Sequence, residues 1–360
     1  MISPPRLADP VRLIPTPGDA AAALRSTLRP RAIRDDDAAD VLRAYGLRPS
    51  ARGVNLGSGR RNALMVIPTP EGHVVLKRYP SRWPIGSIVY EHDILRHLAA
   101  AGFPATRVRS ADDGSTFATV RGHRFAVFAF DAGRSLRGRP LGRGHGTRFA
   151  VVLGAVLAEL HTVLDGFHPL GRHHVGRLTP IEEGDLDSFL RTIDELAGRP
   201  APDGKGSPLW RRLVDRVEWI TTELPPLHRM LAGADLPRSV IHADFGPHNV
   251  AFRSDGSAVV HDFELAHEDR RLVDLVIVLS RSGTTSGRAM IDGYRSRRTL
   301  DGDGWALLGE VWVHHRLVGA IRSWDSYARH GDERRLRAAL ARLDEAERIS
   351  STGVRSWGSP

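Results

Sequence analysis

The stretch that most restricts how this chain can fold runs from Val240 to Glu264, with the sequence V-I-H-A-D-F-G-P-H-N-V-A-F-R-S-D-G-S-A-V-V-H-D-F-E. Two short apolar runs, Val240–Ile241 and Val250–Phe252, flank a polar loop, and a turn separates the second run from a third at Ala258–Val260. Short apolar runs bounded by turn residues are typical of strands. The stretch therefore predicts three strands whose connecting loops point several polar side chains at one place.

The polar side chains of this stretch are of the kinds that phosphoryl transfer uses. Asn249 follows Asp244 by five positions, and Asp262 comes directly after the third predicted strand. In phosphoryl transfer, one aspartate accepts the proton of the attacking hydroxyl, while an asparagine and a second aspartate hold Mg²⁺ against the nucleotide phosphates. The order of the three residues predicts an ATP-dependent kinase.

Upstream, a predicted hairpin carries a loop formed by Gly57, Ser58, Gly59 and Arg60, and the strand after the hairpin contains Lys77. Loop glycines allow backbone N–H groups to approach phosphate oxygens closely. Each feature alone is more often structural, since most such glycine pairs form plain β-turns and most strand lysines are solvated. Their order in the chain favours a nucleotide-binding site.

A helix is predicted over residues 86–101, and a glycine and a proline shortly after it favour its end there. Glu91 lies on the face of this helix that is otherwise apolar. A carboxylate on such a face is unfavourable unless it is paired. Glu91 is therefore either a boundary residue that reaches solvent or the partner of Lys77, holding its ammonium near the phosphates.

The chain has 360 residues, which exceeds a comfortable single core, so two lobes are expected. We find no apolar run near the ~20 residues of a membrane span, and the first residues lack the apolar core of a signal peptide. The absence of cysteine excludes disulfides and thiolate metal sites, and it fits a cytoplasmic enzyme.

The formal net charge of +9 comes almost entirely from arginine, because Lys77 and Lys205 are the only lysines. A basic surface favours anionic partners such as nucleotides, nucleic acids or acidic peptides. The sequence has no block of like charges and no aromatic residues interleaved with basic ones, as nucleic-acid binders have. Nucleic-acid binding as the main function is therefore not expected.

Several short motifs together carry a resemblance to a known family. His242–Asn249 is similar to the pattern H-G-D-x-x-x-x-N, although Ala243 replaces the usual glycine. His261–Glu264 is similar to I-D-F/W-E, with a histidine at the aliphatic position. Further matches are Gly59-x-x-Asn62, Val75–Lys77 with Glu91, Leu157–His161 and Val273–Leu275. With these motifs, the chain resembles the aminoglycoside phosphotransferase and choline kinase-like family, relatives of the protein kinases.

The resemblance implies an α+β, two-lobed, protein-kinase-like fold, with an antiparallel sheet and one long helix in the first lobe and a mainly helical second lobe. We expect an N-terminal extension over 1–34, the first lobe over 35–130, the second over 131–350, and a tail over 351–360. The apolar run Phe149–Thr162 predicts the buried axis of the second lobe. A helix over 209–224 is expected to end at Pro225 and Pro226.

The same resemblance implies the roles of individual residues. Asp244 would be the catalytic base, and Asn249 and Asp262 would hold Mg²⁺. Lys77 and Glu91 would anchor the phosphates of ATP. The residues expected to complete the ATP site are Gly57, Ser58, Gly59 and Arg60 at the phosphates, and Phe128 and Phe130 in a hinge whose backbone binds adenine. His242 and Asp274 are expected to support the catalytic loop.

The phosphate acceptor stays open at this stage. A hydroxyl of a small molecule or natural product is the main expectation, and a Ser/Thr residue of a peptide in a biosynthetic pathway is the alternative. Cationic acceptors need an acidic cleft, and acidic residues in the second lobe are few beyond a cluster at 182–187. A non-catalytic nucleotide-binding pseudokinase is the second alternative.

Overall fold

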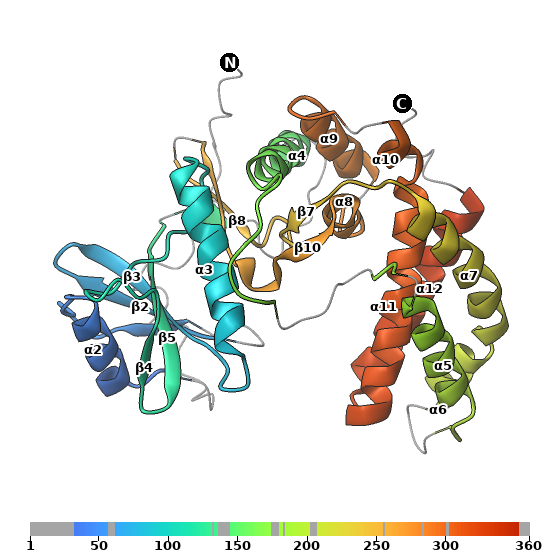
Figure 1. Cartoon of the computed structure of the whole chain (residues 1–360), viewed down its shortest axis with the longest axis horizontal. Coiled ribbons are helices and arrows are strands. Elements are labelled where there is room, and N and C mark those ends of the chain that lie inside the picture. The colour runs from blue at the N-terminus through green and yellow to red at the C-terminus, as the bar shows by residue number, and fades with distance from the viewer. Residues whose placement is uncertain are drawn as a thin grey trace. The chain divides into compact units, whose positions relative to one another are not determined.

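A computed structural model describes residues 32–56, 62–131, 133–135, 145–173, 180–182, 184–201, 207–254, 256–282, 284–299 and 302–352. These residues form two compact units (Figure 1). Unit 1 comprises the described residues within 1–140, 162–175 and 244–266, and unit 2 comprises those within 141–161, 176–243 and 267–360. The lobe boundaries expected from the sequence stay predictions, and most of the N-terminal extension and of the C-terminal tail lies outside the described residues.

Unit 1 is built on a five-stranded antiparallel sheet with the order β1-β2-β3-β5-β4. Its strands are β1 (Val54–Leu56), β2 (Ala63–Thr69), β3 (Gly72–Arg78), β4 (Ala118–Val120) and β5 (His123–Ala129). The tight turn between β2 and β3 ends at Gly72, whose φ of +118° is a conformation that glycine adopts readily. The predicted antiparallel sheet of the first lobe is thus present.

The two faces of this sheet pack against different helices, because successive side chains of each strand point to opposite faces. Helix α2 (Asp35–Ala44) shares a hydrophobic core with one face, including Leu76 of β3 and Val127 of β5. Their neighbours Lys77 and Phe128 point to the other face, because successive side chains of a strand alternate. Helix α3 (Ile85–Ala100) supplies the residues that Lys77 and Phe128 contact there.

A smaller sheet in unit 1 carries the C-terminal part of the Val240–Glu264 stretch. It has the order β6-β8-β9, with β6 (Arg134–Ser135), β8 (Val250–Phe252) and β9 (Ala258–Val260), and it is followed by the 3₁₀ helix η3 (Phe263–Leu265). The N–H of Thr106 donates to the carbonyl of Val260, and the N–H of Val260 donates to the carbonyl of Pro104, both at 2.9 Å. These bonds attach the stretch to the chain that follows α3.

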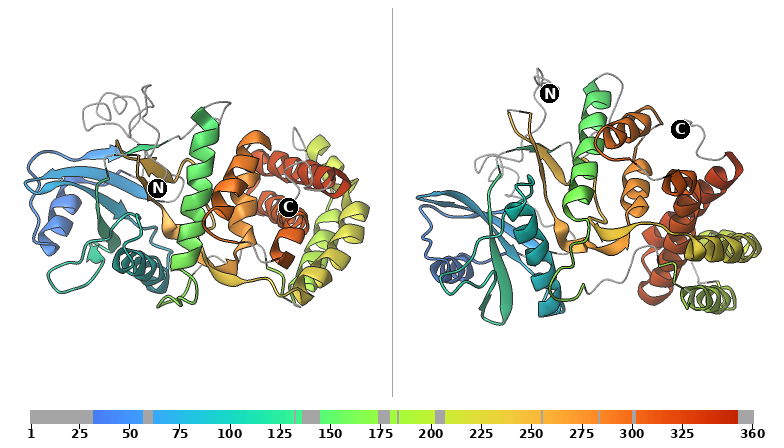
Figure 2. Two further views of the ribbon diagram at one scale, coloured as in Figure 1. Left: turned by 90° about the horizontal axis from the view of Figure 1, so that it is seen from above. Right: turned by 45° about the horizontal axis from the view of Figure 1, so that its top comes forward.

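Unit 2 is mainly helical, as predicted (Figure 2). Its helices are α4 (His145–Val163), α5 (Asp185–Ala197), α6 (Ser207–Val214), α7 (Val217–Gly233), α8 (Leu272–Leu279), α9 (Thr284–Arg295), α10 (Gly302–Ala306), α11 (Leu308–His330) and α12 (Glu333–Thr352). A two-stranded sheet pairs β7 (Arg238–Ile241) with β10 (His267–Arg270). The longest helices, α11 and α12, pack against each other.

The helix expected to end at Pro225 was predicted wrongly. Two helices occupy this region, and the second, α7, continues through Pro225 and Pro226. Its buried stripe, which includes Ile220, Leu224 and Leu231, faces the core of unit 2. Burial of this stripe offsets the ~3 kcal/mol by which a proline disfavours a helix interior.

Helix α4 is the apolar helix that the sequence predicted as an axis of the second lobe. Among the described residues, its segment Gly146–Val163 is the one stretch long and apolar enough to cross a membrane, and half of that segment is buried inside the protein. A Cβ atom on Gly154 would lie 1.9 Å from the carbonyl oxygen of Met290, and one on Gly293 would lie 2.0 Å from that of Val151. Helices α4 and α9 therefore meet backbone to backbone, as core helices do.

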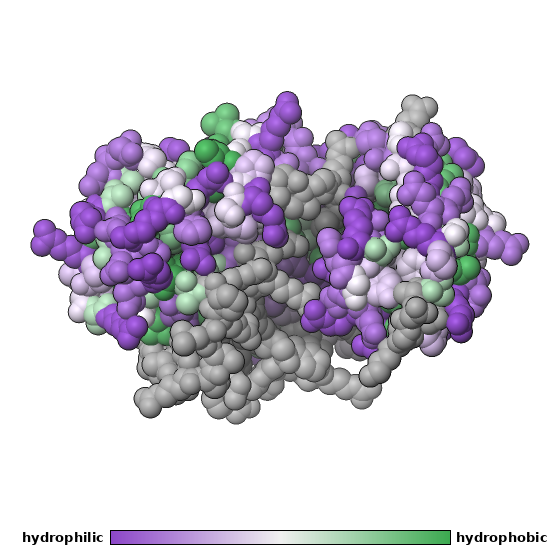
Figure 3. All heavy atoms as spheres, turned by 90° about the horizontal axis from the view of Figure 1, so that it is seen from below, coloured by the Kyte–Doolittle hydropathy of each residue, from purple (hydrophilic) through white to green (hydrophobic). Residues whose placement is uncertain are grey.

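On the face that Figure 3 shows, the described residues are largely polar, with apolar residues scattered among them. Among the described residues, the large apolar side chains that are exposed are Ile85, Leu170 and Met230. Single exposed apolar residues of this kind are normal for a protein surface.

Candidate active site

Of the predicted site residues that carry charge or amide groups, the five that the structure describes all belong to unit 1. Lys77 lies on β3, Glu91 lies on α3, and Asp262 follows β9. Asp244 and Asn249 lie in the loop between β7 and β8. The predicted phosphate loop, Gly57, Ser58, Gly59 and Arg60, lies outside the described residues, so its role stays a prediction.

The predicted ion pair between Lys77 and Glu91 is confirmed. The Nζ atom of Lys77 lies 2.7 Å from Oε1 of Glu91. Lys77 is 5% exposed and Glu91 is 3% exposed, so both charges are out of solvent. Because a buried charge is unfavourable without a partner, the pair explains how Glu91 can occupy an otherwise apolar helix face.

A second carboxylate, which the sequence analysis left without a role, also faces Lys77. Oε2 of Glu264 lies 3.7 Å from Nζ of Lys77, and Nδ2 of Asn62 donates a hydrogen bond to the same oxygen. Both Glu264 and Asn62 are buried, and both stand inside motifs that the sequence analysis recognised. Their positions within those motifs were the signal that could have identified them.

The charge of Lys77 is strongly favoured at this position. Burial works against the charged ammonium, but the carboxylates of Glu91, Glu264 and Asp262 outweigh it and raise the pKa of Lys77 above its ordinary value. The lysine is therefore a fixed positive charge at any physiological pH. A fixed cation suits the binding of nucleotide phosphates.

Two aromatic rings also lie near the ammonium of Lys77. Nζ of Lys77 lies 4.9 Å from the ring centroid of Tyr79 and 5.9 Å from that of Phe128. Phe128, predicted in the hinge, is thus a buried neighbour of the lysine, whereas Phe130 is half-buried with its ring centroid 5.6 Å from that of His73. Backbone binding of adenine by this segment stays a prediction.

Two neighbours from the same loop, which connects β7 and β8, orient Asp244. Nδ2 of Asn249 donates to the carbonyl oxygen of Asp244 at 3.0 Å and to its Oδ2 at 3.1 Å. Nε2 of His248, which the sequence analysis did not single out, lies 3.3 Å from the same Oδ2. The Asp244 side chain is 26% exposed, so its carboxylate is held yet accessible.

Asp262 lies at a strained turn between β9 and η3. Its φ is +66°, a left-handed conformation that costs an L-residue about 1–2 kcal/mol. The N–H of the preceding residue, His261, donates to the carbonyl of Asn249 at 2.8 Å. This bond ties the strand end that carries Asp262 to the residue predicted to share its metal. Backbone strain of this kind is found preferentially at functional sites.

The residues just before Asp244 are fixed by Asp274, as expected. Its two carboxylate oxygens accept the backbone N–H groups of His242 and Ala243, each at 2.7 Å. Nε2 of His161 lies 3.2 Å from Oδ2 of Asp274, and Nδ1 of His161 lies 2.9 Å from the hydroxyl of Tyr294. These residues all belong to unit 2, and they fix the backbone directly before Asp244.

The residues predicted to hold a metal fit a hard cation that also binds phosphate. Among the described residues, no three His, Cys, Asp or Glu side chains gather as a complete metal site. Mg²⁺ is usually bound through one or two carboxylates together with substrate phosphates and water. Asp262 offers a carboxylate, and Asn249 offers its Oδ1 because Nδ2 is the atom that donates to Asp244. This oxygen set suits Mg²⁺.

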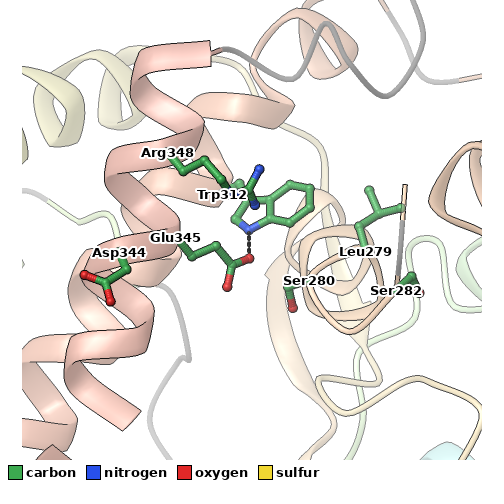
Figure 4. A pocket seen from close by; sticks show the side chains of 7 residues that line it. All are labelled: Leu279, Ser280, Ser282, Trp312, Asp344, Glu345 and Arg348. Atoms are coloured by element: carbon green, nitrogen blue, oxygen red, sulfur yellow. Dashed lines mark hydrogen bonds between the residues drawn. The ribbon is translucent and has the colours of Figure 1, made fainter. Parts of the chain in front are cut away.

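A separate cavity of about 410 Å³ lies in unit 2 (Figure 4). It is lined by Leu279, Ser280, Ser282, Trp312, Asp344, Glu345 and Arg348. Nε1 of Trp312 donates to Oε1 of Glu345 at 2.8 Å, and Nε of Arg316 lies 3.1 Å from the other oxygen of that carboxylate. The central carboxylate is thus neutralised within the protein, and no predicted site residue lines the cavity. We therefore do not assign the chemistry to it.

Residues 52–310 match the model of the phosphotransferase enzyme family. The chain belongs to this family. The predicted enzyme class, a phosphotransferase with an alcohol group as acceptor, is thereby confirmed.

Curated relatives and solved structures are consistent with that membership. The chain is 28% identical to the homoserine kinase of Caulobacter sp. over 286 residues, which cover 74% of this chain and 79% of the relative. It is also 28% identical to the homoserine kinase of Phenylobacterium zucineum, over 74% of this chain and 78% of the relative.

Solved structures share the fold. A microcompartment-associated aminopropanol kinase superposes with a TM-score of 0.63 at 19% identity, over 88% of this chain and 97% of the other. A spectinomycin phosphotransferase, solved with ADP and spectinomycin, superposes with a TM-score of 0.62 at 12% identity, over 90% of this chain and 99% of the other. The predicted α+β kinase-like fold is confirmed.

Proposed function

We propose that this protein transfers the γ-phosphate of MgATP to a hydroxyl group of a small molecule. Asp244 acts as the base, Lys77 binds the α- and β-phosphates, and Glu91 holds Lys77 in place. Asn249 and Asp262 would hold Mg²⁺, which supplies charge neutralisation at the transferred phosphate.

One observation carries this proposal. The buried ammonium of Lys77 lies against Glu91 in the same compact unit that contains Asp244, Asn249 and Asp262. These are the charged and amide groups that phosphoryl transfer requires, on elements of the expected types and in the expected chain order. All of them are present, which argues against a pseudokinase.

The geometry of the loop between β7 and β8 supports these roles for its polar residues. The carboxylate of Asp244 receives the hydroxyl proton as the acceptor oxygen attacks the γ-phosphorus in line with the leaving oxygen of ADP. The contacts from Asn249 and His248 orient that carboxylate. The proton stays on the Asp244 carboxylate during the transfer. It is released to solvent after the phosphorylated product departs.

Relatives and acidic residues both favour a small acceptor over a polycation. The curated relatives are homoserine kinases, and homoserine carries one primary hydroxyl. In unit 2, Glu182 forms an ion pair with Arg238, and Oδ2 of Asp185 accepts the N–H of Glu182 at 2.9 Å. Part of the acidic cluster is thus neutralised within the protein, so it offers little attraction to a polycationic aminoglycoside.

The test is a transfer screen with γ-labelled ATP and Mg²⁺. The acceptors are homoserine, aminopropanol, ethanolamine, spectinomycin, an aminoglycoside and a Ser/Thr peptide library. We expect label on homoserine or another small alcohol. Label on the peptides alone would support the alternative acceptor, and nucleotide binding without any transfer would support the pseudokinase.

A further inference from the structure

We propose that Tyr79 and His92 are positioning residues that select which of two carboxylates holds Lys77. The inference rests on the proposed function, since it concerns how the lysine meets the nucleotide phosphates. Neither residue belongs to a motif of the sequence analysis. Both are buried, and both belong to unit 1.

A chain of hydrogen bonds leads from Lys77 into the interior of unit 1. Oε1 of Glu91 binds Lys77, and its Oε2 lies 2.9 Å from the Tyr79 hydroxyl. The same hydroxyl lies 2.9 Å from Nε2 of His92, and Nδ1 of His92 lies 2.8 Å from the hydroxyl of Thr116. Each member of the chain thus contacts the next within hydrogen-bonding distance.

The donors in this chain can be arranged in one way that satisfies every member. An ionised carboxylate only accepts, so the single O–H of Tyr79 donates to Glu91. Nε2 of His92 then carries the proton and donates to the Tyr79 oxygen, and Nδ1 accepts the O–H of Thr116. Burial, with a contribution from the nearby charge of Lys77, lowers the pKa of His92 to about 3, so the ring stays neutral as this arrangement requires.

The consequence concerns the competition between Glu91 and Glu264 for Lys77. Glu264 lies 3.7 Å from the ammonium, 1.0 Å farther than Glu91 (3.7 minus 2.7). The hydroxyl of Tyr79 fixes the second oxygen of Glu91 and so holds its first oxygen on the lysine. Without that hydroxyl, Glu91 has a buried oxygen with one partner fewer, and the ammonium can move toward Glu264. The cation would then be misplaced for the phosphates.

The ring of Tyr79 also faces the ammonium, so the test must remove the hydroxyl and keep the ring. Tyr79→Phe does this, and Thr116→Val removes the last donor of the chain at a site that is only half-buried. Tyr45→Phe is the matched control, because it removes a buried hydroxyl from the separate core beneath α2 in the same unit.

The measurement is the dissociation constant of MgATP by calorimetry, together with the thermal midpoint of each variant. We expect Tyr79→Phe to weaken MgATP binding by about tenfold and Thr116→Val by about twofold, with Tyr45→Phe unchanged. In a Glu91→Ala background, Tyr79→Phe should weaken binding no further, because the hydroxyl has no carboxylate left to hold.

Three results separate the possibilities. If the unaltered protein binds no MgATP, the proposed function fails and this inference fails with it. If it binds MgATP but Tyr79→Phe binds as tightly as Tyr45→Phe, the inference alone is overturned. The same holds if Tyr79→Phe weakens binding equally with and without Glu91, since that result indicates a general structural role.

Discussion

The backbone N–H of Ala243 donates a hydrogen bond to Oδ1 of Asp274 at 2.7 Å, and Ala243 is held there at a φ of +64°. The family pattern has glycine at this position, and glycine alone adopts such a φ without strain. The buried carboxylate therefore stabilises a conformation that alanine disfavours, directly before the proposed base Asp244.

Replacing Asp274 by asparagine should loosen this turn. The amide offers one acceptor oxygen in place of two, so one of the two buried N–H groups loses its partner. We expect a loss of about 1–3 kcal/mol in the free energy of unfolding, measured with urea, and a larger relative loss of phosphate transfer. Equal stability of wild type and Asp274→Asn would contradict the assigned contacts.

The same variant has a predicted pH dependence. Burial acts to raise the pKa of Asp274, but its hydrogen bond and charge interaction with His161, supported by His242, outweigh burial and lower that pKa. The stabilisation is therefore present above pH 3.8 and is lost as the pH falls through the lowered pKa. The difference in the free energy of unfolding between wild type and Asp274→Asn should therefore decrease as the pH falls below 3.8.

Ala243→Gly tests the strain at the turn. Glycine relieves a conformational penalty of about 1–2 kcal/mol, which offsets the lost methyl burial and the greater freedom of the unfolded chain. We expect the thermal midpoint to stay nearly unchanged. Ala266→Gly is the control, because Ala266 is equally buried but has a φ of −58°. That change should destabilise the protein, and equal losses in the two variants would refute strain at Ala243.

The contact between α4 and α9 predicts a severe effect of one added methyl group. Gly154→Ala would place a carbon 1.9 Å from the carbonyl oxygen of Met290, so the helices must separate. We expect a large drop in the thermal midpoint or failure to fold. Gly233→Ala, in α7 with no atom within 4 Å of the new methyl, should instead leave stability unchanged or raise it slightly. Similar midpoints for both variants would be incompatible with this packing.

Mild acid should destabilise the protein through the buried His92 and His314 and the half-buried His315. Burial, followed by nearby positive or titratable groups, lowers the pKa values of His92, His314 and His315 to about 3. Below pH 6.5 the unfolded chain binds protons that the folded chain excludes, so stability falls as the pH drops from 6.5 toward 3.

Each of these histidines contributes up to about 1.4 kcal/mol per pH unit in this window. The check is the free energy of unfolding between pH 8 and pH 5. His92→Gln should show a shallower decline than wild type, because it removes one of the groups responsible. A flat profile down to pH 5 would show that the buried rings are not held neutral.

The sequence predicted those parts of the site that follow from local periodicity. Lys77 on a strand and Glu91 on the apolar face of a helix could be proposed as partners, because an unpaired buried carboxylate is unfavourable, although the sequence alone also allowed Glu91 to reach solvent. The partners Tyr79 and His92 could not be predicted, since neither belongs to a motif and each looks like an ordinary strand-end or helix residue, whereas the place of Glu264 in the motif His261–Glu264 was a usable signal. Their roles depend on how α3, β3 and η3 pack, which sequence spacing does not specify.

Tertiary packing also explains the error at Pro225. Local rules end a helix at two consecutive prolines, but α7 continues because its buried stripe gains more by extending to Leu231 than the prolines cost. The conformation of Ala243 is a similar case. Alanine by itself disfavours φ > 0, and only the acceptors of Asp274, distant in the sequence, impose it.

The central claim is that Asp244 deprotonates a hydroxyl that then takes the γ-phosphate of MgATP. The most direct measurement compares wild type with Asp244→Asn in the labelled transfer assay, with MgATP binding measured in parallel. We expect label on a small-molecule alcohol with wild type, none with Asp244→Asn, and similar MgATP affinity for both. Transfer by Asp244→Asn at the wild-type rate would contradict the account, as would the absence of any labelled acceptor from a wild-type protein that binds MgATP.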